Sequence, residues 1–179
     1  MRILTSIHPT YLVQTERLYL VPFTLEICEE ILQKNYSVLE KFNLKIGKNW
    51  PDEDFLESLP RVIQLLKKVD TPTGFESWMI IKKETNEIIG DVGFKGFHFL
   101  KNSCDIGYGI VQAERRKGFA YEACKGLINW VLEIDPEITI TATTHLSNSA
   151  SIKLLKKLNF IEHYRDETYI HWENQPTTK

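Results

Sequence analysis

A basic turn is the part of this chain whose residue types most directly suggest chemistry. It joins a hydrophobic segment, residues 105–111, to an amphipathic segment, residues 121–132, and consists of Arg115, Arg116, Lys117, Gly118, Phe119 and Ala120. A strand that ends in a turn and opens a helix presents unpaired backbone N–H groups and the positive end of the helix dipole. Both suit a phosphate, and three basic side chains add charge. The turn therefore predicts a site for a pyrophosphate-bearing cofactor.

The composition is that of an ordinary globular chain. Of 179 residues, 42% are hydrophobic and 26% are charged, which is enough for one domain over residues 1–179. The formal net charge of −2 gives no whole-surface attraction to nucleic acid, so direct nucleic acid binding is not expected. No apolar run reaches the roughly 18 residues of a membrane span, and the N-terminal residues show no signal-peptide pattern. A membrane location is not expected.

The cysteines and histidines do not form a chemical motif. Cys28, Cys104 and Cys124 lie at wide spacing in apolar surroundings, and an odd number is no disulfide framework. We interpret them as buried thiols in a reducing cytoplasm rather than as catalytic groups. The five histidines lack metal-ligand spacing, so no metal site is predicted.

Hydrophobic patterns and turn-forming residues predict a mixed α/β order. Strands are expected over residues 17–22, 77–83, 87–99, 104–111 and 138–144, with one or two more within 160–171. Helices are expected after an N-cap at Thr24, over about residues 52–68, after the basic turn, and over residues 149–158. Pro60 is expected to break or kink the second helix, or to mark its true start. No linker interrupts the order, so one domain is the simplest account.

Two motifs in this order resemble the GNAT superfamily of acetyl-CoA-dependent N-acetyltransferases. Arg115, Gly118 and Ala120 match its Arg/Gln-x-x-Gly-x-Gly/Ala pattern, and Asn148 begins an Asn-Ser-Ala-Ser motif ahead of Lys-Leu-Asn-Phe at residues 157–160. Residues 14–18 and the Ile-Gly-Tyr of residues 106–108 are similar to the ribosomal-protein N-terminal (alanine) acetyltransferase branch. The resemblance covers residues 14–172. It implies an α/β fold with a central, mostly antiparallel, twisted sheet of about six or seven strands flanked by about four helices.

The resemblance assigns cofactor-binding roles for acetyl-CoA. The backbone N–H groups of residues 116–120 would hold the pyrophosphate beside Arg115, and Gly118 would let the backbone approach closely. The backbone at Gly109 and Ile110 would pair with pantetheine as an added strand. Asn148 and Ser151 would lie near pantetheine and the thiol, although Asn148 also suits a helix cap.

Several positions depart from the family pattern. Arg116 stands where many relatives carry Gly, and Asn159 replaces a helix-ending Gly, for which Asn is the next best residue in the left-handed conformation. Leu155 occupies the position where many members place a tyrosine general acid. Ser151 resembles the residue suggested for that role in the ribosomal-protein branch, and its alternative is a plain hydroxyl at a helix start.

No base follows firmly from the sequence. Asp105 is the first candidate, although a surface or salt-bridged strand residue is the more economical interpretation of it. Other candidates near the chain end are Glu162, Glu167 and His163.

The expected reaction is direct attack of an unprotonated amine on the thioester. A lysine amine has a pKa near 10.4 and an α-amine a pKa of about 7.7–8.0, so freeing the lysine amine at neutral pH costs about 3.4 kcal/mol more, from about 2.5 pKa units. A site without the usual tyrosine therefore favours a protein or peptide N-terminus as acceptor. The alternatives are a small-molecule acetyltransferase acting on an antibiotic, polyamine or amino acid, and a CoA-binding module without transfer activity.

The acceptor site is expected between residues 43–51 and the last strands. Trp50, Tyr164, Tyr169 and Trp172 are candidate lining residues, with ordinary core or rim packing as the alternative. The sequence is compatible with a monomer or a homodimer.

Overall fold

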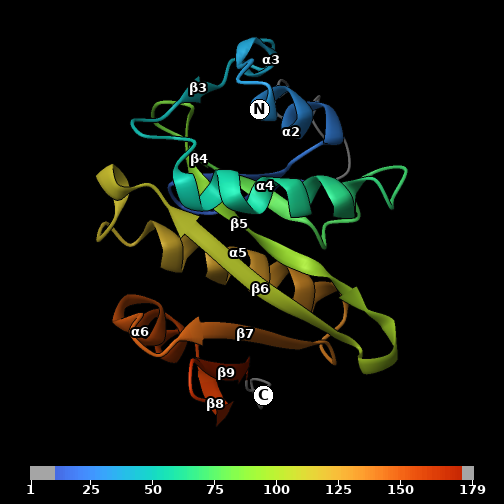
Figure 1. Cartoon of the computed structure of the whole chain (residues 1–179), viewed down its shortest axis with the longest axis vertical. Helices are drawn as coiled ribbons and strands as arrows, with labels where there is room; N and C mark the ends of the chain where they lie inside the picture. Colours follow the sequence, from blue (N-terminus) through green and yellow to red (C-terminus); the bar gives the residue numbers. More distant parts are fainter. Residues whose placement is uncertain (1–10, 175–179) are drawn as a thin grey trace.

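A nine-stranded sheet organises the chain in the computed structural model, which describes residues 11–174 (Figure 1). The strands follow the order β1-β2-β4-β5-β6-β7-β9-β8, and β3 pairs with β5 off this path. Their bounds are β1 Val13–Gln14, β2 Leu18–Pro22, β3 Lys45–Ile46, β4 Ser77–Lys82, β5 Glu87–His98, β6 Ser103–Ile110, β7 Thr139–His145, β8 Phe160–Arg165 and β9 Tyr169–Asn174. All pairings are antiparallel except β3 with β5 and β6 with β7.

Five α-helices lie within the described residues, and their starts follow from local capping. Thr24, Asp52 and Asn148 each accept a hydrogen bond from a backbone N–H in the first turn of their helices. The bounds are α2 Leu25–Leu32, α3 Ser37–Glu40, α4 Glu53–Leu66, α5 Phe119–Ile134 and α6 Ser149–Lys157, with 3-10 turns at Phe99–Lys101 and Gln112–Glu114. The predicted fold class is confirmed. The element counts exceed expectation because β1, β3 and α3 are only two to four residues long.

The expectation that Pro60 breaks the second helix is wrong. Helix α4 continues from Glu53 to Leu66 through Pro60. A proline in a helix interior costs about 3 kcal/mol because it lacks an N–H and crowds the preceding turn. An apolar face offsets this cost, since α4 buries Phe55, Leu59, Val62, Ile63 and Leu66.

Strands β6 and β7 diverge in the middle of the sheet. They pair only where Ser103, Cys104 and Asp105 lie opposite Thr139, Ile140 and Thr141. Beyond that point β6 remains paired with β5 up to Ile110, and β7 remains paired with β9 up to His145. Helix α4 covers one face of the sheet beside this opening and α5 covers the other (Figure 1).

The start of α5 is fastened to the N-terminal strands through Glu122. This carboxylate accepts hydrogen bonds from the Thr15 hydroxyl at 2.6 Å and from the Arg17 backbone N–H and Nε at 2.7 Å each. Arg17 also donates from Nη1 to the Lys117 carbonyl at 3.0 Å, and its guanidinium lies over the Phe119 ring. Burial acts to raise the pKa of Glu122, but the bonds from Thr15 and Arg17 outweigh it and hold that pKa below its usual value.

We expect Glu122→Gln to lower the free energy of unfolding by about 1–3 kcal/mol at pH 7, because it removes charge-assisted bonds to Arg17. A lowered carboxyl pKa stabilises the fold above the unfolded pKa, and this stabilisation is lost as the pH falls through the folded value. Urea unfolding from pH 3 to pH 7 should therefore show the two proteins converging at the acid end. Glu133→Gln, at an exposed position of the same helix, is the matched control. A constant difference across this range would contradict the assignment.

Candidate active site

The turn before α5 has the backbone conformation of an anion site. Gly118 has φ of 85° and Arg116 has φ of 65°, both in the left-handed region that favours glycine. Arg116 therefore stands at a position whose backbone conformation favours Gly. No side chain caps α5, whose first intrahelical bond runs from the Glu122 N–H to the Gly118 carbonyl. The N–H groups of Phe119, Ala120 and Tyr121 precede it and point out of the helix end.

The basic side chains of this turn are held in different ways. Arg115 donates from Nε to the Ile110 carbonyl at 2.7 Å and approaches Asp54 at 3.7 Å and Asp52 at 4.0 Å. Lys117 pairs with Glu114 at 2.9 Å. Arg116 is exposed, with no ion pair among the described residues. Arg115 thus connects the turn to the start of α4.

The free side of β6 is the second feature of the site. The Val111 N–H donates to the Ile89 carbonyl, and hydrogen-bonded pairs alternate along an antiparallel ladder. The backbone groups of Gly109 therefore point to β5, so the expectation that Gly109 pairs with pantetheine is wrong. The groups of Tyr108 and Ile110 point instead to the gap beside β7. An extended ligand can pair with β6 there as an added strand.

Helix α6 follows β7, which borders the other side of the gap. Asn148 caps this helix by accepting a hydrogen bond from the Ser151 N–H at 3.1 Å. Leu155 is fully buried in the core. Asn159 takes a φ of 63° at the helix end, as its residue type predicts.

A tyrosine hydroxyl from β6 lies near Ser151. The Tyr108 hydroxyl is buried and has no partner with hydrogen-bond geometry among the described residues. Burial raises the pKa of Tyr108 to about 12, although the neighbouring Ser151 side chain acts in the opposite direction. Tyr108 is therefore protonated at neutral pH and has a proton to donate in the gap.

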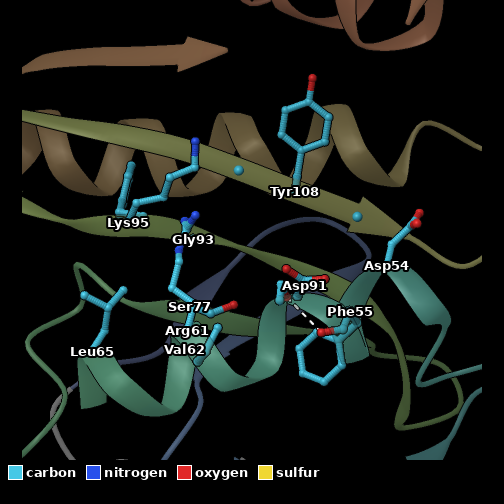
Figure 2. A pocket seen from close by; sticks show the side chains of 14 residues that line it. Asp54, Phe55, Arg61, Val62, Leu65, Ser77, Asp91, Gly93, Lys95 and Tyr108 are labelled. Carbon is cyan, nitrogen blue, oxygen red and sulfur yellow. Dashed lines mark hydrogen bonds between the residues drawn. The ribbon is translucent and has the colours of Figure 1, made fainter. Parts of the chain in front are cut away.

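A groove of about 270 Å³ lies between α4 and the sheet (Figure 2). Its floor is mostly backbone, because Gly93, Gly107 and Gly109 contribute no side chains, and a Cβ on Gly107 would meet only open space. The lining residues come from α4 and from β4, β5 and β6: Asp54, Phe55, Ser58, Arg61, Val62, Leu65, Ser77, Asp91, Gly93, Phe94, Lys95, Gly107, Tyr108 and Gly109.

Asp91 is the titratable group on the groove floor. It lies opposite Gly109 on β6, so close that a Cβ on Gly109 would be 3.2 Å from its Oδ1. Burial, together with the carboxylates of Asp52 and Asp54, raises the pKa of Asp91 to about 7. The residue keeps partial exposure to the groove. A carboxylate with this pKa can take up a proton at neutral pH.

The base candidates named from the sequence lie elsewhere. Asp105 forms an ion pair with Lys95 and accepts a bond from the Thr141 hydroxyl at 3.2 Å, so it has the salt-bridged position that was the economical interpretation. Glu162 pairs with Arg165 at 2.5 Å, and His163 lies 3.9 Å from Glu173. Glu167 is exposed in the β8–β9 turn. None of the four lines the groove described above.

The four aromatic candidates divide between core and surface. Trp50 and Trp172 are only 4% and 2% exposed and belong to the core, which was the alternative interpretation. Tyr164 and Tyr169 are exposed on β8 and β9. None of them lines the groove described above.

The thiols take no part in this site. All three cysteines are free and buried, as predicted, and burial raises the pKa of Cys28 and of Cys104 to about 12. Within residues 11–174, no group of three or more His, Cys, Asp or Glu side chains is arranged to hold a metal ion. No helix in that part of the chain is long and apolar enough to cross a membrane.

Comparison with known proteins identifies the chemistry that this geometry serves. The family model for the acetyltransferase (GNAT) domain matches residues 17–161. The chain belongs to this family. It is 33% identical over 161 residues to YjdG, an uncharacterized N-acetyltransferase of Bacillus subtilis (strain 168), covering 90% of this chain and 96% of that relative. The protein is therefore a GNAT N-acetyltransferase.

Solved structures show the same fold at low sequence identity. A RimL ribosomal alpha-N-protein acetyltransferase in complex with coenzyme A has a TM-score of 0.66 at 14% identity and covers 94% of this chain and 100% of its own. A spermidine N-acetyltransferase chimera from Vibrio cholerae and hSSAT has a TM-score of 0.63 at 15% identity. The match covers 90% of this chain and 97% of the chimera. Membership of the GNAT family supports acetyl-CoA as the donor, and the uncapped start of α5 and the open side of β6 fit it.

Three residues of the candidate site were not found by sequence reasoning. Asp91 is one of many acidic residues, and only its pairing with Gly109 marks it. Tyr108 was noted as part of a motif but not as a hydroxyl in the gap. Arg17 lies in the N-terminal motif, and its contact with Lys117 joins segments far apart in the chain.

We expect Gly118→Trp to abolish measurable acetyl-CoA binding in calorimetry. A side chain there meets both the strain of positive φ, about 1–2 kcal/mol, and the space that a phosphate needs against the helix end. Its Cβ would already lie 3.4 Å from Arg17 Nη2. Glu133→Ala, near the other end of α5, should bind as the wild type does. Unchanged affinity in Gly118→Trp would remove this turn from the cofactor site.

Proposed function

We propose that this acetyltransferase transfers the acetyl group, by direct attack, to the α-amine of a protein or peptide N-terminus. The observation that carries the proposal is Asp91, a carboxylate with a pKa of about 7 on the floor of an open groove and opposite Gly109. An α-amine with a pKa of about 7.7–8.0 differs from it by only about one unit, whereas a lysine amine differs by about three. Proton transfer to Asp91 therefore suits an α-amine better.

Groups on one side of β6 would bind the cofactor, and Asp91 on the other side would accept the amine proton. The N–H groups at the start of α5, with Arg116, would hold the pyrophosphate, and the free backbone of Tyr108 and Ile110 would orient the pantetheine arm. Asp91 would take the amine proton, directly or through a water molecule. The bound donor supplies the thioester carbonyl and a thiol leaving group.

Tyr108, aided by Ser151, would donate a hydrogen bond to the departing sulfur. The leaving thiol has a pKa of about 8.5, whereas Tyr108 has a pKa of about 12. The thiolate is therefore too weak a base to take the proton from Tyr108. Tyr108 therefore stabilises the thiolate as a donor rather than by full proton transfer. This assigns to β6 the role that a tyrosine at the position of Leu155 plays in other family members.

A polyamine is the second candidate acceptor. Asp52 and Asp54 lie near Asp91 and lower the electrostatic potential at that end of the groove, which favours a cationic amine.

An acceptor panel separates these functions. It contains peptides with a free N-terminus, the same peptides N-terminally blocked but carrying lysine, spermidine, and an aminoglycoside antibiotic. Turnover should be highest with free N-termini. Turnover restricted to spermidine or the antibiotic would remove the N-terminal proposal.

We expect Asp91→Asn to lower kcat/KM by about 10²–10⁴, because the amide cannot accept the amine proton. The wild-type pH profile should rise through a limb near pH 7 that the variant lacks, leaving the limb of the amine itself near pH 8. Asp105→Asn is the matched control, since its carboxylate pairs with Lys95 outside the groove. An equal loss in Asp105→Asn, with Asp91→Asn active, would return the base assignment to Asp105.

The Asp91→Asn variant should be more stable than the wild type at pH 8. A raised folded pKa means that Asp91 binds its proton more tightly in the folded state, so it favours unfolding as the pH rises from about 4 to about 7. The difference in midpoint temperature should therefore grow from pH 4 to pH 8. A difference that shrinks over this range would contradict the burial of a charged Asp91.

We expect Tyr108→Phe to lower kcat by about 10- to 100-fold with little change in acetyl-CoA affinity, because only the hydroxyl facing the departing sulfur is lost. Ser151→Ala should have a smaller effect, and Tyr164→Phe, at an exposed position of β8, should have none. Single-turnover kinetics would measure the chemical step. A wild-type rate in Tyr108→Phe would exclude this donor role.

A further inference from the structure

The groove of this acetyltransferase has opposite charges at its two ends. Asp54, Ser58, Arg61 and Leu65 recur on α4 at intervals of three or four residues, so they form one stripe that lines the groove. Arg61 follows Asp54 by seven positions, which corresponds to about 10 Å along a helix. The floor runs alongside, with Asp91 and Gly109 paired at the acidic end and Gly93 and Gly107 paired next to them.

Arg61 is the cation of this groove that lacks a protein partner. Lys95 is paired with Asp105, and Arg115 approaches Asp52 and Asp54. Arg61, in contrast, is exposed and makes no ion pair with any residue in 11–174. Figure 2 shows its side chain extending from α4 towards Gly93 on β5, while Asp54 and Asp91 lie towards the other end. A guanidinium presents five donors in a planar fork that matches a carboxylate.

We propose that the acceptor carries a carboxylate a short distance from its amine, with the amine at Asp91 and the carboxylate at Arg61. This inference rests on the proposed function and specifies its substrate class. Arg61 extends towards Gly93, which lies two residues along β5 from Asp91, or about 7 Å. An extended peptide advances about 3.3–3.6 Å per residue, so this length corresponds to an acidic side chain at the third residue, and the reach of a glutamate side chain also allows the second. A short linear ω-amino acid also carries an amine and a carboxylate at this spacing, but its amine has the higher pKa of a lysine side chain. A polyamine would place a second cation against Arg61, which disfavours it.

A charge-swap experiment tests the assignment. Three hexapeptides share a free N-terminal serine and differ only at residues two and three, which are Glu-Glu, Gln-Gln or Lys-Lys, and 6-aminohexanoate represents the small-molecule source. The wild type should prefer the Glu peptide over the Lys peptide in kcat/KM by about tenfold or more, as one charge-assisted contact allows. Arg61→Ala should remove the preference, Arg61→Glu should reverse it, and Arg61→Lys should retain part of it.

Lys68→Glu is the matched control. It makes the same change of net charge just beyond α4, at an exposed residue that does not line the groove, and should keep the wild-type preference. Higher kcat/KM for 6-aminohexanoate than for the Glu peptide would identify a small amino acid as the source, and the reverse would identify a polypeptide.

Two failures are distinguishable. Equal turnover of the three peptides by the wild type, or a preference that survives in Arg61→Ala, would overturn this inference and leave N-terminal acetylation intact. Acetyl-CoA binding without turnover of any of the peptides would overturn the proposed function. If 6-aminohexanoate is also not turned over, this inference fails with it.

Discussion

The separation of β6 from β7 is the constraint on which the rest of the site depends. The two strands pair for only three residues, after which each keeps its other neighbour. The backbone groups of Tyr108 and Ile110 are thereby left without a strand partner in the interior of a sheet, where an unpaired polar group is costly. One such group, the Ile110 carbonyl, accepts a bond from Arg115. The others face a gap that an extended ligand can fill, so the sheet offers a vacant ladder position between α5 and α6.

Arg115 and Glu122 connect this gap to the start of α4, beside the groove, and to the first turn of α5. Arg115 contacts β6 through Ile110 and the start of α4 through Asp52 and Asp54. Glu122 holds the first turn of α5 against Thr15 and Arg17. The ion pairs of Arg115 and Glu122 therefore position the basic turn, residues 115–120, relative to the groove. Asp91 lies on the floor of the groove, where burial and neighbouring carboxylates oppose its ionisation. Such a group lowers stability in its charged form, which is a common property of catalytic positions.

Local signals account for the parts of the structure that could be predicted. Features that depend on residues close in the sequence include the helix caps, the left-handed residues and most strand bounds. The caps are Thr24, Asp52 and Asn148, and the left-handed residues are Gly118 and Asn159. Pro60 misled because the buried face of α4 outweighs a local backbone cost. The two-residue strands β1 and β3 were missed because so short a segment has no periodicity of its own, and only their partners β2 and β5 make them strands.

The sequence by itself determined the family, the order of elements and the position of the basic turn before α5, since each of these depends on contiguous residues. Only the tertiary structure distinguished among carboxylates and hydroxyls of the same type. It placed Asp105 beside Lys95 and Asp91 beside Gly109, and it brought Tyr108 near Ser151 across a gap between strands. It also placed Arg61 and Asp91 in one groove. A side chain's proton affinity and its reach to a ligand depend on burial and on neighbours distant in the chain, and these exist only after folding.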